Sequence, residues 1–441
     1  MDAIAPNVRQ TDPLERETIR RVAWRLLPLL MLGYFCAYLD RVNVGMAAPT
    51  MNQQLGFSGA VFGFGAGLFF FGYFLAEIPS NLILNKMGAR RWIARILITW
   101  GIISGLTAFV WNDWSFYGIR FLLGLGEAGF YPGVVLYLTW WFPSAYRSRM
   151  MAIFQSSVMI SLIIGPPASG LLLRMDGIWA LAGWQWLFIL EALPPIIMCF
   201  VMWRLLTDRP NDAAWLRPDQ KAWLTDRLAD ERAQREAVRK YSLGEVFSNP
   251  KMLLLTLAFV GPNCTAYALV FFLPLIVRGL GVPTNMVGPV SALPYAFAFV
   301  AMLCWCAHSD RTGERTWHVA GACLLTSAGL SACIFIGVDH PVLTMIALIV
   351  AVMGQQSISP TFWSLPTALL TGTAAAGGIA MINSVGNLGG FLGPWVFGLV
   401  KDASGSDNIA LLSLALAPVI SAIAVPLAGH DRRLERIPPR A

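Results

Sequence analysis

Charged residues are scarce in this chain of 441 residues. Asp, Glu, Lys and Arg make up 13% of it, against about 25% in soluble globular proteins. Hydrophobic residues make up 56%, and the mean hydropathy is +0.60. So little charge cannot cover a water-facing surface, which argues against a soluble enzyme. A polytopic membrane protein remains, since the apolar residues suffice for roughly twelve spans of about 20 residues each.

The motifs of nucleotide and metal chemistry are missing as well. No Gly-x-x-x-x-Gly-Lys-Ser/Thr sequence occurs, which argues against a P-loop ATPase. The seven cysteines form no Cys-x-x-Cys pair, and the four histidines show no metal-ligand spacing. No nucleophile–base pattern is visible either. We therefore expect neither an enzyme nor a metal or other cofactor.

Apolar runs separated by turn residues and charges divide the chain into two sets of six predicted spans. The first set lies near 24–48, 58–84, 92–111, 115–141, 149–173 and 184–207, and the second near 252–277, 286–308, 317–337, 341–369, 374–400 and 409–429. The fourth and tenth runs are interrupted by prolines (Pro132, Pro360 and Pro366). The predicted domains are a cytoplasmic N-terminal tail (1–23), a six-helix bundle (24–207), a cytoplasmic linker with an amphipathic helix (208–250), a second six-helix bundle (251–429) and a cytoplasmic tail (430–441).

Lys and Arg gather in the N-terminal tail, in the loops after the second, fourth and eighth spans, in the central stretch and in the C-terminal tail. The positive-inside rule places these segments, and so both termini, in the cytoplasm of a multi-pass protein of the inner (plasma) membrane. The net charge of +7 is then a topology signal, and we expect no nucleic-acid partner. The central segment 218–238 alternates apolar and charged residues. A helix at the membrane surface and a solvated linker helix both fit this pattern.

The two sets of spans resemble each other. The loop around Gly88 after the second span matches the loop around Gly313 after the eighth span. Gly165-Pro166 with Gly170 in the fifth span matches Gly393-Pro394 with Gly398 in the eleventh, at nearly the same offset. Repeated six-span halves are typical of alternating-access transporters.

Several motifs resemble those of the major facilitator superfamily, and more narrowly of its anion:cation symporter family. The loop signature occurs in degraded form in both halves: the first copy has Asn85-Lys86 where Asp-Arg is usual, and the second keeps Asp310-Arg311. The span motifs that carry the resemblance are Tyr38-Leu39-Asp40-Arg41-Val42-Asn43, residues 120–127, residues 362–366 and residues 383–390. The resemblance covers roughly residues 20–430. It implies an all-α membrane protein of twelve transmembrane helices in two pseudo-symmetric six-helix bundles, which takes up an organic anion with protons.

A charge inside a span costs from about 3 to over 10 kcal/mol, so the few intramembrane ionisable residues are the first functional candidates. They are Asp40, Arg41, Glu77, Arg120, Glu127 and Glu191. Asp40 and Glu127 lie at similar depth, as proton coupling between access states requires, and we assign them to it. Arg41 and Arg120 are predicted to bind the substrate carboxylate, because arginine offers a planar fork that stays charged when buried. Arg120 and Glu127 are seven residues apart and share one helix face.

Structural alternatives stay open for each of these residues. Asp40 could belong to a static Asp–Arg pair, and Glu127 to a structural pair with Arg120. Arg41 lies about 100° around the helix from Asp40 and could belong to a gate instead. For Glu77 and Glu191, a role in hydrogen bonding loop backbone or the basic gate loops is favoured over a functional one.

Neutral residues complete the predicted site. Tyr73, Trp363 and Asn383 match positions that line the site in the family that the chain resembles, and Tyr38 and Gln155 are further candidates. The predicted gating residues come from the two matching loops: Lys86, Arg90, Arg91, Asp310 and Arg311.

We therefore expect a secondary transporter that imports a small organic carboxylate by proton symport, such as a tartrate-like hydroxy acid, phthalate or 4-hydroxyphenylacetate. Its partners are the carboxylate, protons and the lipid bilayer, its energy source is the proton gradient, and it is expected to be monomeric. The alternative within this fold is an organic-anion exchanger or exporter, such as a drug efflux pump. A membrane enzyme or sensor is the alternative from another class.

Overall fold

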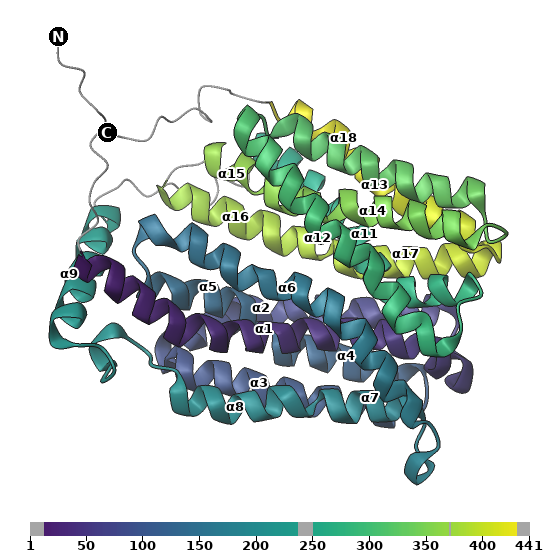
Figure 1. The fold of residues 1–441 in the computed structure, drawn as a ribbon, viewed down its shortest axis with the longest axis horizontal. Coiled ribbons are helices and arrows are strands. Elements are labelled where there is room, and N and C mark those ends of the chain that lie inside the picture. Colours follow the sequence, from purple (N-terminus) through teal and green to yellow (C-terminus); the bar gives the residue numbers. More distant parts are fainter. Residues whose placement is uncertain (1–12, 237–249, 370–371, 430–441) are drawn as a thin grey trace.

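The computed structural model describes residues 13–236, 250–369 and 372–429, and these are almost entirely helical (Figure 1). The N-terminal half consists of α1 (Pro13–Leu55), α2 (Gly59–Met87), α3 (Ala89–Leu106), α4 (Asp113–Glu127), α5 (Phe130–Trp141), α6 (Ser144–Leu172), α7 (Gly183–Glu191) and α8 (Leu193–Leu205). The C-terminal half consists of α11 (Pro250–Gly279), α12 (Val287–Thr312), α13 (Thr316–Ile336), α14 (Pro341–Phe362), α15 (Ser364–Leu369), α16 (Gly372–Asn387), α17 (Gly389–Ser404) and α18 (Asp407–Leu427).

Shorter elements join these helices. The helix α9 (Pro218–Glu236) lies between the halves in sequence, and five 3₁₀ turns are η1 (Thr107–Phe109), η2 (Leu173–Met175), η3 (Ile178–Ala180), η4 (Pro210–Asp212) and η5 (Thr284–Met286). Parts of the predicted tails (1–12 and 430–441) and the end of the predicted linker (237–249) lie outside the described residues.

Eleven segments of the described residues are long and apolar enough to cross a membrane. The predicted span 374–400 is not among them because it is divided at Leu388 into α16 and α17, each of 16 residues. The predicted fourth, sixth and tenth spans are divided in the same way, into α4 and α5, α7 and α8, and α14 and α15. Broken helices are tolerated in membranes where neighbouring protein satisfies the freed backbone groups.

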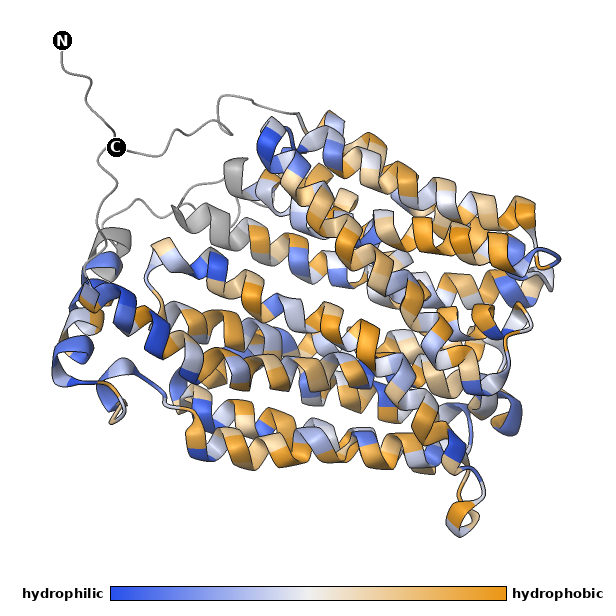
Figure 2. Cartoon of the chain, viewed as in Figure 1, coloured by the Kyte–Doolittle hydropathy of each residue, from blue (hydrophilic) through white to orange (hydrophobic). Residues whose placement is uncertain are grey.

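The outer faces of the helices are apolar along most of their length, and the hydrophilic residues gather at the two ends (Figure 2). Large apolar side chains such as Leu75, Leu303 and Ile423 are exposed there, as lipid contact requires. The pattern is that of a bundle whose middle lies in a bilayer.

The two halves lie side by side, with α1–α8 in one and α11–α18 in the other (Figure 1). Across the interface α2 packs on α17, α6 on α12 and α1 on α11. We call the end that carries α9 and the first turn of α1 the proximal end, and the opposite end the distal end (Figure 1).

At the distal end the two halves are in direct contact. Asp402 at the end of α17 accepts hydrogen bonds from the backbone N–H groups of Gly59 (2.9 Å) and Ala60 (2.7 Å) at the start of α2. The guanidinium of Arg278 donates to the carbonyl oxygen of Pro49. The rings of Phe62 and Phe272 also meet here, with centroids 5.3 Å apart.

The α2–α17 contact is close enough to require glycine. A Cβ atom added to Gly63 would lie 2.1 Å from the carbonyl oxygen of Pro394, and one added to Gly398 would lie 2.0 Å from that of Gly59. The two helices therefore touch backbone to backbone along this seam. Any larger residue at these positions would separate them.

The helix α9 is attached to the N-terminal half. Glu231 accepts hydrogen bonds from the backbone N–H of Ser144 and pairs with Arg147 at 3.3 Å. Before the helix begins, Arg217 pairs with Glu17 of α1 at 3.0 Å, and Trp215 stacks on Trp141 with ring centroids 5.4 Å apart. These contacts hold the start of the linker against the proximal end.

Candidate functional site

The break in the fourth span positions Glu127. The helix α4 ends at Glu127, Gly129 adopts φ 90°, and α5 begins at Phe130. The carbonyl oxygen of Ala128, which the break frees, accepts a hydrogen bond from Ser80 Oγ at 2.8 Å. Ser80 Oγ in turn accepts one from Trp92 Nε1 at 2.9 Å. This chain of bonds fixes the end of α4 and with it the direction of the Glu127 side chain.

Glu127 forms an ion pair with Arg41 of α1. Arg41 Nε and Nη2 donate to Glu127 Oε1 at 3.1 Å and 2.5 Å, and both side chains are buried. The other carboxylate oxygen, Oε2, is buried without a hydrogen-bond partner. The sequence alternative of a structural pair between Glu127 and Arg120 is therefore not what the structure contains.

Arg120 has fewer polar partners than Arg41. Its side chain is 1% exposed, its Nη2 reaches the carbonyl oxygen of Ala66 only at 3.5 Å, and its Nε has no hydrogen-bond partner. Among the described residues it forms no ion pair within 4.0 Å. A buried guanidinium with unused donors is costly, and an anion is the group that would satisfy it.

Aromatic rings surround both arginines. The ring of Phe69 is close to both, with its centroid 5.3 Å from Arg41 Cζ and 5.4 Å from Arg120 Cζ. Tyr38 (4.8 Å) and Tyr73 (5.7 Å) also lie over Arg41. Ring faces stabilise cations through their quadrupole, so this wall supports two charges where lipid would not.

The C-terminal half contributes aromatic residues that the sequence reasoning missed. Phe271 of α11 lies 5.9 Å from Arg120, and Tyr267 of α11 packs on Phe70 of α2 with centroids 4.2 Å apart. The N-terminal Phe69 was missed as well. Aromatic residues make up 12% of the chain, so composition alone could not single these out.

Asp40 points away from Arg41, toward α3. Its Oδ1 accepts hydrogen bonds from Asn43 Nδ2 (3.1 Å) and Ser104 Oγ (2.8 Å), and its Oδ2 accepts one from Trp100 Nε1. The 100° between neighbouring helix positions explains why Asp40 and its neighbour Arg41 face different partners. The static Asp–Arg pair considered for Asp40 is absent from the described residues.

The other predicted site residues have neighbours outside the arginine pair. Trp363 lies in a C-terminal apolar cluster, 4.9 Å from the ring of Phe259. Asn383 is half-buried on α16, beside Ser384, whose Oγ reaches Glu77 Oε2 across the interface at 3.5 Å. Gln155 of α6 donates to the hydroxyl of Tyr131 at 3.3 Å.

The predicted gate of the first half is bound within its own half. The backbone N–H of Arg90 donates to Asp208 Oδ1 at 2.8 Å, and Lys86 and Arg91 are exposed. Asp208, just after α8, thus supplies a carboxylate beside the loop in which Asn85-Lys86 replaces the usual Asp-Arg. No motif in the sequence pointed to this distant partner.

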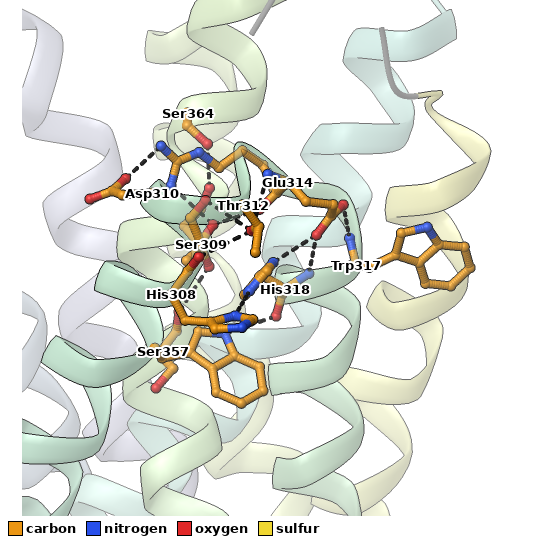
Figure 3. A network of polar contacts seen from close by, with 12 residues as sticks. His308, Ser309, Asp310, Thr312, Glu314, Trp317, His318, Ser357 and Ser364 are labelled. Atoms are coloured by element: carbon orange, nitrogen blue, oxygen red, sulfur yellow. Dashed lines mark hydrogen bonds and ion pairs between the residues drawn. The ribbon is translucent and has the colours of Figure 1, made fainter. Parts of the chain in front are cut away.

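The matching loop of the second half holds a compact polar network (Figure 3). Asp310 pairs with Arg315 at 2.6 Å, and His318 bridges His308 (2.8 Å) and Glu314 (2.7 Å). Arg311 is exposed. Burial alone would raise the pKa of Glu314. Hydrogen bonds from the backbone and ring of His318 and the backbone of Trp317 outweigh it, so the pKa is lowered.

The two ends of the molecule therefore differ. At the distal end, hydrogen bonds from Asp402 and Arg278 join the halves. At the proximal end, each ion pair formed between described residues stays within one half or joins the N-terminal half to the start of the linker.

Comparison with known proteins identifies the family. The chain matches the Major Facilitator Superfamily over residues 30–394. It belongs to this superfamily of membrane transporters, which confirms the resemblance inferred from the loop and span motifs and the predicted two-bundle fold.

Relatives and a solved structure agree with this assignment. A protein of Agrobacterium vitis named "Putative tartrate transporter" is 49% identical over 413 residues, 94% of this chain and 91% of the relative. A "Quinolone resistance transporter" of Acinetobacter baumannii is 39% identical over 415 residues, 93% and 94% of the two chains. A bacterial homologue of the human lysosomal transporter Spinster, solved inward-facing and unoccupied, has a TM-score of 0.75 at 17% identity and covers 98% of this chain and 100% of its own.

Proposed function

We propose that this transporter imports a small organic carboxylate together with protons, and that Arg120 and Arg41 bind the carboxylate. The observation that carries the proposal is Arg120, a fully buried guanidinium with an unpartnered Nε and no ion pair among the described residues. The relatives of Agrobacterium vitis that are named for tartrate support the hydroxy-acid class, and tartrate is the first substrate to test.

The charges of the site give a physical reason for proton coupling. Arg41 and Arg120 contribute two positive charges, and Asp40 and Glu127, when ionised, contribute two negative ones. An anion that enters alone leaves a net negative charge in a low-dielectric interior, which is expensive. A proton that enters with it restores the balance, so anion and proton bind more favourably together than separately.

Glu127 is the residue through which the proton would act on the substrate. As a carboxylate it occupies the Arg41 fork through Oε1. A proton on Glu127, whose Oε2 has no partner, removes the charge that holds Arg41. Arg41 is then free to bind the substrate carboxylate beside Arg120. Asp40 is proposed as the second proton site.

We further propose that the proximal end faces the cytoplasm, as the Lys and Arg distribution predicts. The contacts that close the distal end then make this an inward-facing arrangement. In this orientation the residues Lys86, Arg90, Arg91, Asp310 and Arg311 lie at the cytoplasmic mouth. They are proposed to meet across the interface in the outward-facing state, which agrees with the partners that Arg90 and Asp310 have inside separate halves here.

The test is transport by the purified protein in proteoliposomes. An inward proton gradient should drive accumulation of labelled tartrate, and a protonophore should abolish it. In Asp40→Asn and Glu127→Gln, gradient-driven accumulation should fall at least about tenfold. Counterflow of labelled against unlabelled substrate at equal pH should survive in at least one of them, because exchange releases no proton. Wild-type accumulation by both variants would contradict the assignment.

Export is the second candidate, favoured by the relative of Acinetobacter baumannii that is named for quinolone resistance. The same vesicles distinguish the two. Import with protons predicts uptake that follows the proton gradient into the vesicle. Exchange for protons predicts loss of preloaded substrate against it. Phthalate and 4-hydroxyphenylacetate, tested beside tartrate, would then define the substrate class.

A further inference from the structure

A second polar cluster lies inside the N-terminal half, between α1, α3, α6 and α7, behind the arginine pair. Its acidic members are Asp40 and Glu191, which are 2% and 3% exposed. Asn43 joins them, because its Nδ2 donates to Asp40 Oδ1 at 3.1 Å and its side chain lies within hydrogen-bonding reach of Glu191. Ser169 of α6 donates to Glu191 Oε1 at 2.7 Å.

The hydrogen bonds differ between the two acids. Asp40 accepts from three donors, the side chains of Asn43, Ser104 and Trp100, which is the environment of a carboxylate. Glu191 accepts only from Ser169, and its Oε2 is buried with no partner. A charged carboxylate with one empty oxygen in a membrane-embedded interior would be strongly disfavoured.

The hydrogen-bonding atoms of Asn43 indicate which of the two acids carries a proton. It is 0% exposed, and its Oδ1 is also buried without a partner. Two acceptor oxygens, Glu191 Oε2 and Asn43 Oδ1, therefore lack a donor in the same cluster. A hydrogen atom on Glu191 Oε2 would turn this empty acceptor into a donor, and the amide oxygen of Asn43 is an acceptor without a donor in the same cluster.

The local backbone also disfavours a charge on Glu191. Glu191 is the last residue of α7, where the helix dipole places partial negative charge. Pro194 and Pro195 follow, and neither has an N–H to donate to the turn that contains Glu191. The contrast with Glu127 is informative: that glutamate also ends a helix, but it has Arg41 as its partner.

We propose that Glu191 is a further proton-binding residue of the transport cycle, which holds a proton on Oε2 toward Asn43 Oδ1 while Asp40 is ionised. Asn43 has one donor side and one acceptor side, so it distinguishes the two acids. A rotation of the Asn43 amide by a half-turn exchanges the positions of Nδ2 and Oδ1. The proton then belongs on Asp40, and the charge belongs on Glu191. The pair then holds one proton between its two carboxyls in either arrangement. This inference rests on the proposed proton coupling and deepens it.

The neighbours that influence this pair come from five helices. The titratable and polar side chains that act on Asp40 or Glu191 are Cys36 and Asn43 of α1, Trp100 and Ser104 of α3, Arg120 and Glu127 of α4, and Ser169 of α6, besides the two acids of α1 and α7 themselves. Arg120 and Glu127 act on Asp40 and so link the cluster to the substrate site. A substrate anion beside Arg120 would make a proton on Asp40 more favourable, which is the coupling that symport needs.

Infrared spectroscopy tests the protonation directly. The purified wild-type protein at neutral pH should show a neutral-carboxyl C=O band that is absent from Glu191→Gln. Ser169→Ala should shift the same band, because Ser169 is the hydrogen-bond partner of Glu191. If Glu191→Gln removes no such band, Glu191 is ionised and the proposal is wrong. Where Glu191→Gln fails to insert, the Ser169→Ala shift and Glu191→Asp decide in its place.

Transport tests the role in coupling, with Glu77→Gln as the matched control, a buried glutamate of the same half outside the cluster. Glu191→Gln should lower gradient-driven accumulation about tenfold and leave counterflow within about twofold of wild type. Glu77→Gln should change neither. Wild-type accumulation by Glu191→Gln would make Glu191 a structural acid.

Two other outcomes are separable. If wild type shows no gradient-driven uptake, the proposed symport fails, while the infrared band still decides whether Glu191 carries a proton. If Na⁺ at fixed pH stimulates uptake in wild type but not in Glu191→Gln, the two empty oxygens bind a cation instead of sharing a proton. That result would overturn the inference.

Discussion

The two halves share an architecture but bury different chemistry. Among the described residues, the buried charged side chains all belong to the N-terminal half: Asp40, Arg41, Glu77, Arg120, Glu127 and Glu191. The buried polar side chains described in the C-terminal half are neutral, such as Thr265, Ser309 and Gln355. The C-terminal half adds aromatic rings at the interface, including Tyr267 and Phe271.

This difference assigns the binding of charge to the N-terminal half and leaves the C-terminal half without buried charges of its own among the described residues. The N-terminal half holds its buried ions close together, so in the proposed cycle they exchange partners with proton and substrate inside one half. The C-terminal half carries no described buried charge that would have to change partners if the two halves rotate against each other. Internal repetition thus preserves the motion while the chemistry has become asymmetric.

The largest effect should come from giving the C-terminal half a charge. Gln355 is buried and donates through Nε2 to the carbonyl oxygen of Pro262 at 3.0 Å. Gln355→Glu removes that donor and adds an unpaired charge, and we expect a loss of about 3 kcal/mol in the free energy of unfolding at neutral pH. Thermal unfolding in detergent measures it, with Gln355→Met as the neutral control. An unchanged midpoint would show that this half tolerates charge.

The second-largest effect should come from changing Arg120, the buried charge of the N-terminal half that has no ion pair among the described residues. Arg120→Lys keeps the charge and loses the planar fork, and substrate affinity should fall roughly 30-fold, or about 2 kcal/mol. Arg95→Lys is the control, because Arg95 stacks on Trp92 at 3.9 Å on α3, outside the site. Equilibrium binding to the purified variants tests this, and equal affinity in Arg120→Lys and wild type would refute anion binding at Arg120.

A moderate effect is expected where the halves meet at the distal end. Asp402→Ala removes two hydrogen bonds to the first turn of α2, a carboxylate at a helix N-terminus. The population with an open distal end should rise about tenfold, or about 1.4 kcal/mol. Distances between spin labels at residues 53 and 403, in a protein without its seven cysteines, report the change. Asp402→Asn should have a smaller effect, and identical distance distributions in all three proteins would contradict the prediction.

The smallest effect concerns the loop of Figure 3. Glu314 accepts from the backbone N–H groups of Trp317 (2.6 Å) and His318 (3.1 Å) at the start of α13. Its pKa is lowered, so its stabilisation is present above the ordinary carboxyl pKa and is lost as pH falls through the lowered value. Glu314→Gln should cost at most about 1 kcal/mol at neutral pH. The difference from wild type should vanish in acid, as thermal unfolding against pH would show; a constant difference would exclude this role.

Helix positions could be predicted from the sequence because lipid demands long apolar runs. The twelve predicted runs correspond to the observed helices or helix pairs. Four of these runs are broken, and the prolines Pro132 and Pro360 indicated the breaks in the fourth and tenth. The breaks at Ala192 and Leu388 were not predicted. In the eleventh span no proline stands at Leu388, and in the sixth the prolines Pro194 and Pro195 follow the break at Ala192.

The site could be predicted only as a set of residues. Scarcity of charge in the spans pointed to Asp40, Arg41, Arg120 and Glu127, but not to the pairs they form. Those pairs depend on helix rotation and on contacts between distant segments, such as Arg41 with Glu127 across 86 positions. For Glu191 the sequence favoured a bond to loop backbone or to the basic gate loops, whereas in the structure Ser169 of α6 donates to it.

The glycine seam between α2 and α17 affects the free energy that is needed to open the distal end. Gly63 and Gly398 bring peptide groups together without side chains, so at these two positions parting the helices exposes no apolar side chain. Around them the distal closure combines a few polar bonds, whose partners water can replace, with ring contacts such as Phe64 with Trp395 and Phe62 with Phe272. The binding energy of one small carboxylate is large enough to change the relative populations of two access states that differ by contacts of this kind. In the proposed symport, binding of the carboxylate and its proton can therefore shift the balance between the access states, while the proton gradient supplies the energy for accumulation.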